Sequence, residues 1–198
     1  MAADWRVVSM TVKRWLSGGI ALVLVGLSFL LLYQAIDRFN ESAYPLDYVE
    51  TVSHAAEEYH IPPSLIYAVI HTESHFRPSV SSHAGAVGLM QITDDTYRWA
   101  LQRAKVEDTY DSNALLDPDT NILIGTYILH LLREDFTQIE TVLAAYNAGQ
   151  GKVHQWLSDP ACSADGVTLQ HIPYTETADY IDRVLSAQER YQTIYNIP

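Results

Sequence analysis

An uncharged run of 22 residues, from Trp15 to Ile36, constrains the fold of this chain more than any other feature. Its central part, Ile20 to Leu32, consists almost entirely of Leu, Val, Ile, Ala and Phe. A helix needs about 20 apolar residues to cross the hydrocarbon core of a bilayer. The run therefore predicts one N-terminal transmembrane helix, with Trp15 and Tyr33 at the depth of the two interfaces.

The charges on either side of this run predict its orientation. Arg6, Lys13 and Arg14 precede it, and Asp37 begins the segment that follows. Because basic residues stay on the cytoplasmic side, we expect the N-terminus inside and the remainder outside. The alternative is secretion after signal cleavage, but no A-x-A cleavage pattern follows the run. We therefore expect residues 1–14 to be cytoplasmic, 15–36 to be a single-pass anchor, 37–45 to be a linker and 46–198 to be one domain.

Charge and cysteine content exclude several classes of protein. From Asp37 onward the chain has 9 basic and 23 acidic side chains, a net charge of −14. Such a surface repels phosphate backbones, so we expect no nucleic-acid partner. Cys162 is the single cysteine, so an intrachain disulfide is impossible and the core alone must stabilise the fold.

Helical periodicity alternates with turn signals through the expected domain, and no convincing strand pattern appears. The fold class is therefore mainly α, with six or more helices and at most a small β-hairpin within the Ser-, Gly- and Pro-rich loop 76–92. Proline suits a first helical turn at Pro63 and Pro118, and Thr93, Asp117 and Thr175 are expected helix caps. The expected helices cover residues 47–59, 63–74, 93–104, a segment beginning at 118, 138–148 and 175–195.

Glu73 is the residue that most indicates chemistry. In its predicted helix it shares the face of Ile66, Val69 and Ile70, which must be buried. Burial and the negative end of the helix dipole both disfavour the charged carboxylate, so its pKa should rise. A raised pKa suits a general acid at neutral pH. From position alone, an exposed glutamate at a frayed helix end, or one paired with Arg77, remains the alternative.

Four segments in order along the chain carry a resemblance to a known family. They read Glu73-Ser74-His75-Phe76-Arg77-Pro78, Gly88-Leu89-Met90-Gln91, Ala145-Tyr146-Asn147-Ala148-Gly149, and Glu176-Thr177 followed by Tyr180. This pattern resembles E-S-x-F-x-P, G-L-M-Q, A-Y-N-A-G and E-T-x-x-Y of the lytic transglycosylases, over about residues 46–197. The resemblance implies a lysozyme-like fold of the goose type, with 46–198 as the catalytic domain and a peptidoglycan glycan strand as substrate.

The resemblance also implies a role for each matching residue. Glu73 matches the catalytic acid and base of the family, and Tyr180 matches the tyrosine that positions that carboxyl. Substrate-binding positions are implied at Ser74, Gly88, Leu89, Met90, Gln91, Tyr146, Asn147 and Tyr180. Helix packing is the alternative explanation for each of them, and a simple turn is the alternative for Gly88.

The implied reaction cleaves the β-1,4 bond between N-acetylmuramic acid and N-acetylglucosamine and leaves a 1,6-anhydromuramoyl end. One Glu serves as acid and then as base, so no cofactor and no metal are expected. His71 and His75 flank Glu73, but their spacing does not match the zinc-protease pattern H-E-x-x-H.

Two other functions stay open from the sequence. A muramidase of lysozyme type would need a second carboxylate to position water, and Asp94 or Asp95 could supply it. A catalytically silent glycan-binding scaffold is the second alternative, although intact Glu73, Gln91 and Tyr180 argue against it.

Overall fold

The computed structural model describes the backbone of residues 5–106, 110, 111 and 113–198, and the side chains of these residues from Leu24 onward. The chain divides into two units, one ending at Pro45 and the other extending from Leu46 to Pro198.

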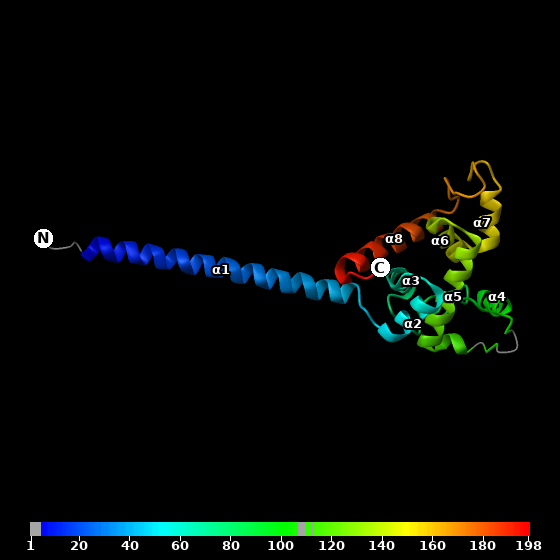
Figure 1. Ribbon diagram of the computed structural model, residues 1–198, viewed down its shortest axis with the longest axis horizontal. Helices are drawn as coiled ribbons and strands as arrows, with labels where there is room; N and C mark the ends of the chain where they lie inside the picture. The colour runs from blue at the N-terminus through cyan, green and yellow to red at the C-terminus, as the bar shows by residue number, and fades with distance from the viewer. Residues whose placement is uncertain (1–4, 107–109, 112) are drawn as a thin grey trace. The chain divides into compact units, whose positions relative to one another are not determined.

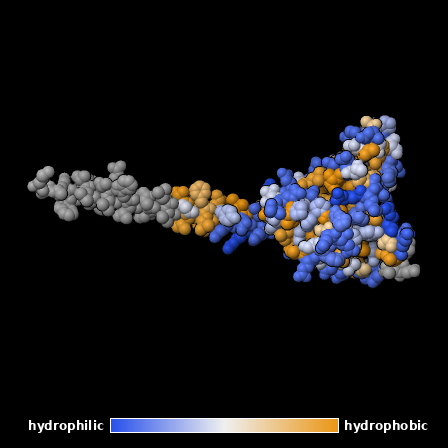
Figure 2. Space-filling view, in the orientation of Figure 1, coloured by the Kyte–Doolittle hydropathy of each residue, from blue (hydrophilic) through white to orange (hydrophobic). Residues whose placement is uncertain are grey.

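The first unit is the helix α1, Trp5–Ala43. Its apolar side chains are exposed from Leu24 to Ile36, as the orange segment in Figure 2 shows. Among the residues with described side chains, no helix combines the length and the hydropathy needed to cross a membrane. The first part of the expected span, residues 15–23, lies outside those residues. Residues 37–43, expected in a linker, are helical.

The second unit is mainly helical, as predicted. Its helices are α2 Val49–Tyr59, α3 Pro63–Ser74, α4 Asp94–Ala104, α5 Pro118–Asp135, α6 Ile139–Ala148, α7 Gln150–Leu157 and α8 Thr175–Tyr195, with a 3-10 helix at Ala114–Leu116. Extended pairing within the described residues is limited to two isolated antiparallel bridges, in which Val87 pairs with Ser81 and with Ile92. The loop after α3 therefore turns back on itself without forming a full hairpin.

Side-chain capping explains the starts of α4 and α5. The Thr93 side chain accepts a hydrogen bond from the Thr96 amide at 3.3 Å, and Asp117 accepts one from the Thr120 amide at 2.9 Å. The expected cap at Thr175 is wrong, because Thr175 is already helical and Tyr174, which makes no side-chain cap bond, precedes it.

Helix α3 lies at the centre of the core. It is apolar nearly all round, and eight of its twelve residues are buried, which is typical of an interior helix. Figure 1 shows α8 beside it, and the rings of Tyr67 and Tyr191 stack between the two helices with centroids 5.3 Å apart. Helix α3 ends where His75 adopts a left-handed conformation, with φ of 51°. This termination leaves Glu73 in the last turn.

Candidate active site

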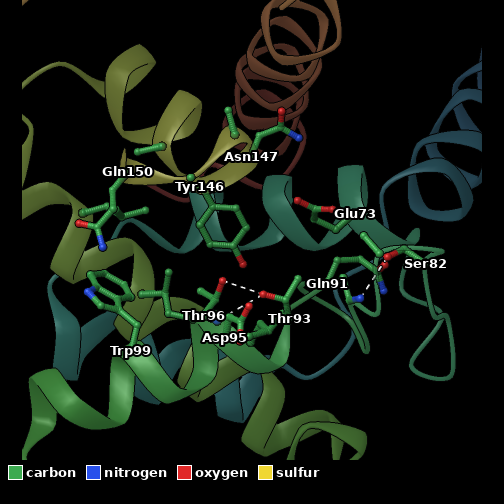
Figure 3. Close-up of a pocket in the computed structure, with 18 of the residues that line it drawn as sticks. Glu73, Ser82, Gln91, Thr93, Asp95, Thr96, Trp99, Tyr146, Asn147 and Gln150 are labelled. Carbon is green, nitrogen blue, oxygen red and sulfur yellow. Dashed lines mark hydrogen bonds between the residues drawn. The ribbon is translucent and has the colours of Figure 1, made fainter. Parts of the chain in front are cut away.

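A cavity of about 670 Å³ lies in the second unit. Such a volume is within the range of about 300–1,000 Å³ that is usual for ligand sites. Figure 3 shows the labelled side chains that surround it. The lining residues are Glu73 of α3, Ser82, Ala84, Ala86, Gln91 and Ile92 of the following loop, Thr93, Asp95, Thr96 and Trp99 of the α4 segment, Ile128 and Leu132 of α5, Ala145 to Gly151 at the corner of α6 and α7, and Glu176 of α8.

Glu73 is the only α3 side chain that lines this cavity. It continues the face of Val69 and Ile70, which are both fully buried. Burial is the main cause that raises the pKa of Glu73 from 4.5 to about 7, while Tyr180 and the positive charge of Arg183 act in the opposite direction. The carboxyl is therefore poised to hold and to release a proton near neutral pH.

Two tyrosines adjoin Glu73. The Tyr180 side chain is 2 % exposed, and burial together with the negative charge of Glu73 raises its pKa well above the usual value. Its hydroxyl lowers the pKa of Glu73, yet it has no partner in good hydrogen-bond geometry among the described residues. The Tyr146 hydroxyl donates to the carbonyl of Met90 at 2.8 Å, which fixes its ring above the cavity floor.

A single buried amide, that of Asn121, holds the loop that carries Gln91. Its Oδ1 accepts from the Met90 amide at 2.8 Å, and its Nδ2 donates to the carbonyls of Val87 at 3.0 Å and Leu115 at 2.9 Å. Gly88 is required beside it, because a Cβ at that position would lie 2.1 Å from Nδ2 of Asn121. The loop is thus pinned to the start of α5.

Gln91 reaches the cavity in an unusual backbone conformation, with φ of 49°. Its side-chain nitrogen donates to the carbonyls of Val80 at 3.0 Å and Gly88 at 2.9 Å. These two bonds fix the amide, and they leave its oxygen as the atom available to accept a hydrogen bond from a ligand.

The structure divides the sequence-predicted site residues into two groups. Glu73, Gln91, Tyr146 and Asn147 line the cavity, whereas the others lie behind its wall. The second group consists of Ser74, Gly88, Leu89, Met90 and Tyr180.

Ser74 makes a contact within its own helix. It follows Glu73 by one residue, which turns it about 100° around the helix, and its fully buried hydroxyl donates to the Ile70 carbonyl at 3.1 Å. Leu89 and Met90 are fully buried and do not line the cavity.

The two candidate second carboxylates differ in position. Asp95 lines the cavity, whereas Asp94 does not. Hydrogen bonds from Tyr110 and then Arg98 lower the pKa of Asp94, and its carboxylate lies 2.8 Å from Nε of Arg98. Asp94 is therefore held on the outer surface of α4, and of these two aspartates only Asp95 lines the cavity.

His71 and His75 contact each other at the end of α3. Their rings stack with centroids 4.9 Å apart. Across the part of the chain that the structure describes, no group of three or more His, Cys, Asp or Glu side chains is arranged to hold a metal ion.

Sequence reasoning assigned no site role to Asn121 or to many of the lining residues, among them Trp99, Gln150 and Glu176. The Glu176 carboxyl begins α8 within the E-T-x-x-Y segment, so that motif could have indicated it. Asn121 carries no local signal, because its role depends on a loop about 31 residues earlier in the chain.

Comparisons with known proteins agree with this geometry. The family model described as the transglycosylase SLT domain matches residues 50–165. A soluble lytic murein transglycosylase of Escherichia coli is 35% identical over 154 residues, covering 77% of this chain and 24% of that protein. A membrane-bound lytic murein transglycosylase C of Salmonella paratyphi B is 32% identical over 167 residues, covering 73% of this chain and 46% of that protein.

The fold also matches a solved structure. The crystal structure of a 70 kDa soluble lytic transglycosylase from Escherichia coli superposes with a TM-score of 0.68 and 32% identity, over 78% of this chain and 25% of that one. This chain thus spans about a quarter of the soluble relatives and less than half of the membrane-bound one. With its four motifs, its helical fold and more than half of its length matched, the chain belongs to the transglycosylase SLT domain family.

Proposed function

We propose that this chain is a peptidoglycan lytic transglycosylase in which Glu73 acts first as an acid and then as a base. The observation that carries the proposal is the partly buried Glu73 carboxyl on the cavity wall, with its pKa raised to about 7. At neutral pH a large fraction of this group is protonated, so it can donate to a leaving oxygen. Once ionised, it can also accept a proton.

The reaction cleaves the β-1,4 bond between N-acetylmuramic acid and N-acetylglucosamine. Glu73 protonates the bridging oxygen, the glycosidic bond breaks, and N-acetylglucosamine leaves with a free hydroxyl. The substrate's own N-acetyl group supports the anomeric carbon, so no protein nucleophile is needed. The Glu73 carboxylate then removes the proton from the muramoyl C6 hydroxyl, whose oxygen closes the 1,6-anhydro ring. Glu73 ends protonated, as it began, and no water is consumed.

Tyr180, Tyr146 and Gln91 support this chemistry from three sides. Tyr180 interacts with the Glu73 carboxyl from within the core and would position it. The Tyr146 ring and the fixed Gln91 amide border the same space and would contact the sugars. Asn147 accepts a hydrogen bond from the Thr177 hydroxyl at 2.8 Å, which links the A-Y-N segment to α8 at the edge of the site.

A muramidase acting on the same bond is the competing function, because Asp95 lines the same cavity as Glu73. Mass spectrometry of digested peptidoglycan separates the two reactions. We expect anhydromuramoyl ends, which are one water lighter than reducing ends, from both the wild-type chain and Asp95→Asn. Reducing muramic ends from the wild-type chain, lost in Asp95→Asn, would instead assign a hydrolase.

For the location of the chain, we propose a single-pass anchor over residues 15–36 with the catalytic domain outside the cytoplasm. Support comes from the uncharged run, from the exposed apolar side chains of α1 after residue 23, and from a relative whose name describes it as membrane-bound. The full chain should remain in the membrane fraction after alkaline washing, and a C-terminal tag should be accessible to protease from outside. Release of the chain by the wash would argue for secretion after cleavage.

A further inference from the structure

Trp99 lies on the cavity wall but belongs to none of the four family segments. It shares one face of α4 with Asp95 and Thr96, since these positions are three or four residues apart. In Figure 3, Tyr146 lies between Glu73 on one side and Trp99 with Gln150 on the other. Trp99 therefore borders the part of the cavity remote from the candidate acid.

The Trp99 ring also contacts a cation that does not line the cavity. The Arg103 guanidinium lies over the ring, 5.8 Å from its centroid, and is not among the residues that line the cavity. Arg103 is itself held by Glu134 at 3.2 Å and Asp135 at 3.5 Å at the end of α5. A cation against one face of a tryptophan is attractive, so this arrangement helps to fix the ring.

The corner of α6 and α7 contributes small residues to the same cavity. Ala148, Gly149 and Gly151 line it, and a Cβ added at either glycine would meet no atom within 4 Å. This part of the cavity therefore contains an aromatic ring and unfilled space. The polar side chains of Asp95 and Gln150 lie at its edges, and no Lys or Arg is found among the described lining residues.

We propose that Trp99 and the Gly151 corner form a remote sugar-binding subsite, in which a further N-acetylhexosamine of the same strand stacks on the indole. The proposal rests on the function proposed above and extends it. The face of a pyranose ring presents C–H groups, which suit the electron-rich face of an indole. The hydroxyl and amide groups at the edge of the sugar then reach Asp95 and Gln150.

The subsite predicts that affinity depends on strand length. Because Trp99 borders the part of the cavity remote from Glu73, we expect a disaccharide beside Glu73 to fall short of the ring and a longer strand to reach it. The expected consequence is a gain in affinity with length that requires both the ring and the open space at Gly151.

The experiment measures binding without turnover, by calorimetry on the full chain carrying Glu73→Gln. The probes are di- and hexasaccharides of alternating N-acetylglucosamine and N-acetylmuramic acid. Adding Trp99→Leu, which keeps an apolar side chain, should weaken hexasaccharide binding about tenfold and leave disaccharide binding within about twofold. Gly151→Leu, which fills the space without removing the ring, should have the same effect.

A matched control accompanies these variants. Tyr174→Leu removes an exposed aromatic ring that does not line the cavity, so it should bind as the parent does. Equal hexasaccharide affinity in the parent, Trp99→Leu and Gly151→Leu, with each variant folded by its thermal melt, overturns the subsite. Equal weakening of both probes does so as well, because it indicates a general disturbance of the cavity.

The products distinguish this proposal from the function on which it rests. With Glu73 intact, Trp99→Leu should still release anhydromuramoyl ends, with lower kcat/KM on long strands than on short ones. If the wild-type chain yields none, the proposed function fails. If anhydro ends form and the length dependence is unchanged, the subsite alone fails.

Discussion

Individual side chains show how this core produces an acid with a pKa near neutrality. Glu73 occupies the last turn of a helix that is mostly buried, so removal from water raises its pKa, and Tyr180 and Arg183 counteract part of that rise. A carboxyl with this pKa destabilises the folded state at any pH at which it must ionise.

The stability of the chain should therefore depend on pH through Glu73. Its pKa is about 7 in the folded state and 4.5 normally, so between these values the folded state binds more protons than the unfolded state. The stability that protonated Glu73 adds to the folded state is fully present below pH 4.5 and is lost as pH rises through 7. The total loss is about 3 kcal/mol. Glu73→Gln should match the wild-type free energy of unfolding within about 1 kcal/mol at pH 4 and exceed it by about 3 kcal/mol at pH 8.

Urea denaturation at the two pH values measures this difference. Glu57→Gln, which replaces an exposed glutamate on α2, controls for the loss of one negative charge. A difference between Glu73→Gln and the wild-type chain that does not change with pH would contradict the raised pKa.

Tyr180→Phe should change the pH profile of catalysis. The Tyr180 hydroxyl lowers the pKa of Glu73, so its removal should move the alkaline limb of kcat/KM, expected near pH 7, to higher pH. We also expect kcat to fall more than KM rises, because the carboxyl is less well positioned. An unshifted limb together with a lowered melting temperature would indicate that Tyr180 serves packing only.

Sequence patterns predicted part of the site, for identifiable reasons. Glu73 could be placed on a buried face because one helix supplies both the carboxyl and its apolar neighbours. Asn121 and Trp99 could not be assigned, because their functions depend on segments that meet only in the folded chain. Ser74, in contrast, was assigned from a motif, and a motif names a position without saying which way its side chain points. In the structure that side chain bonds within its own helix.

The start of a helix was predicted well where a residue close to it in the sequence marks that start. Pro63, Thr93 and Asp117 each act within a few residues, so the starts of α3, α4 and α5 follow from the sequence. Helix α7 was missed because Gly149 both ends α6 and precedes α7 directly, and a glycine pair so close together resembles a loop. That corner forms one wall of the cavity.

The loop pinned by Asn121 should be the element most sensitive to small substitutions. Gly88 and Gly85 both have positive φ, of 81° and 79°, so alanine strains either by roughly 1–2 kcal/mol. At Gly88 the methyl group also displaces the Asn121 amide, whereas at Gly85 it meets no atom within 4 Å. Gly88→Ala should therefore lower the free energy of unfolding by about 2 kcal/mol more than Gly85→Ala does.

Chemical denaturation of the two glycine variants provides the comparison, with Asn121→Ala as a third arm. Asn121→Ala removes the partner of the Met90 amide and of the Leu115 carbonyl, whereas the Val87 carbonyl keeps its bond from the Ile92 amide; the change should cost about 3 kcal/mol. Equal losses at Gly88 and Gly85 would show that the Asn121 contacts do not hold the loop.

The molecule as a whole separates a long N-terminal helix from a unit that contains the entire cavity. All lining residues fall between Glu73 and Glu176, and the buried core begins at Val52. Residues 46–198 should therefore fold without α1, with a single cooperative transition within a few degrees of that of the full chain. Differential scanning calorimetry of both chains checks this, and loss of the transition on truncation would show that α1 is needed for the fold.

The most direct measurement of the central claim is the rate at which anhydromuropeptides are released from purified peptidoglycan by the wild-type chain and by Glu73→Gln. A positioned general acid contributes about 10²–10⁴-fold to a rate, and here one carboxyl performs both proton transfers. The amide should reduce release at least about 100-fold at pH 6 while the chain stays folded. Release by Glu73→Gln at near the wild-type rate would contradict the assignment of Glu73 as the acid and base.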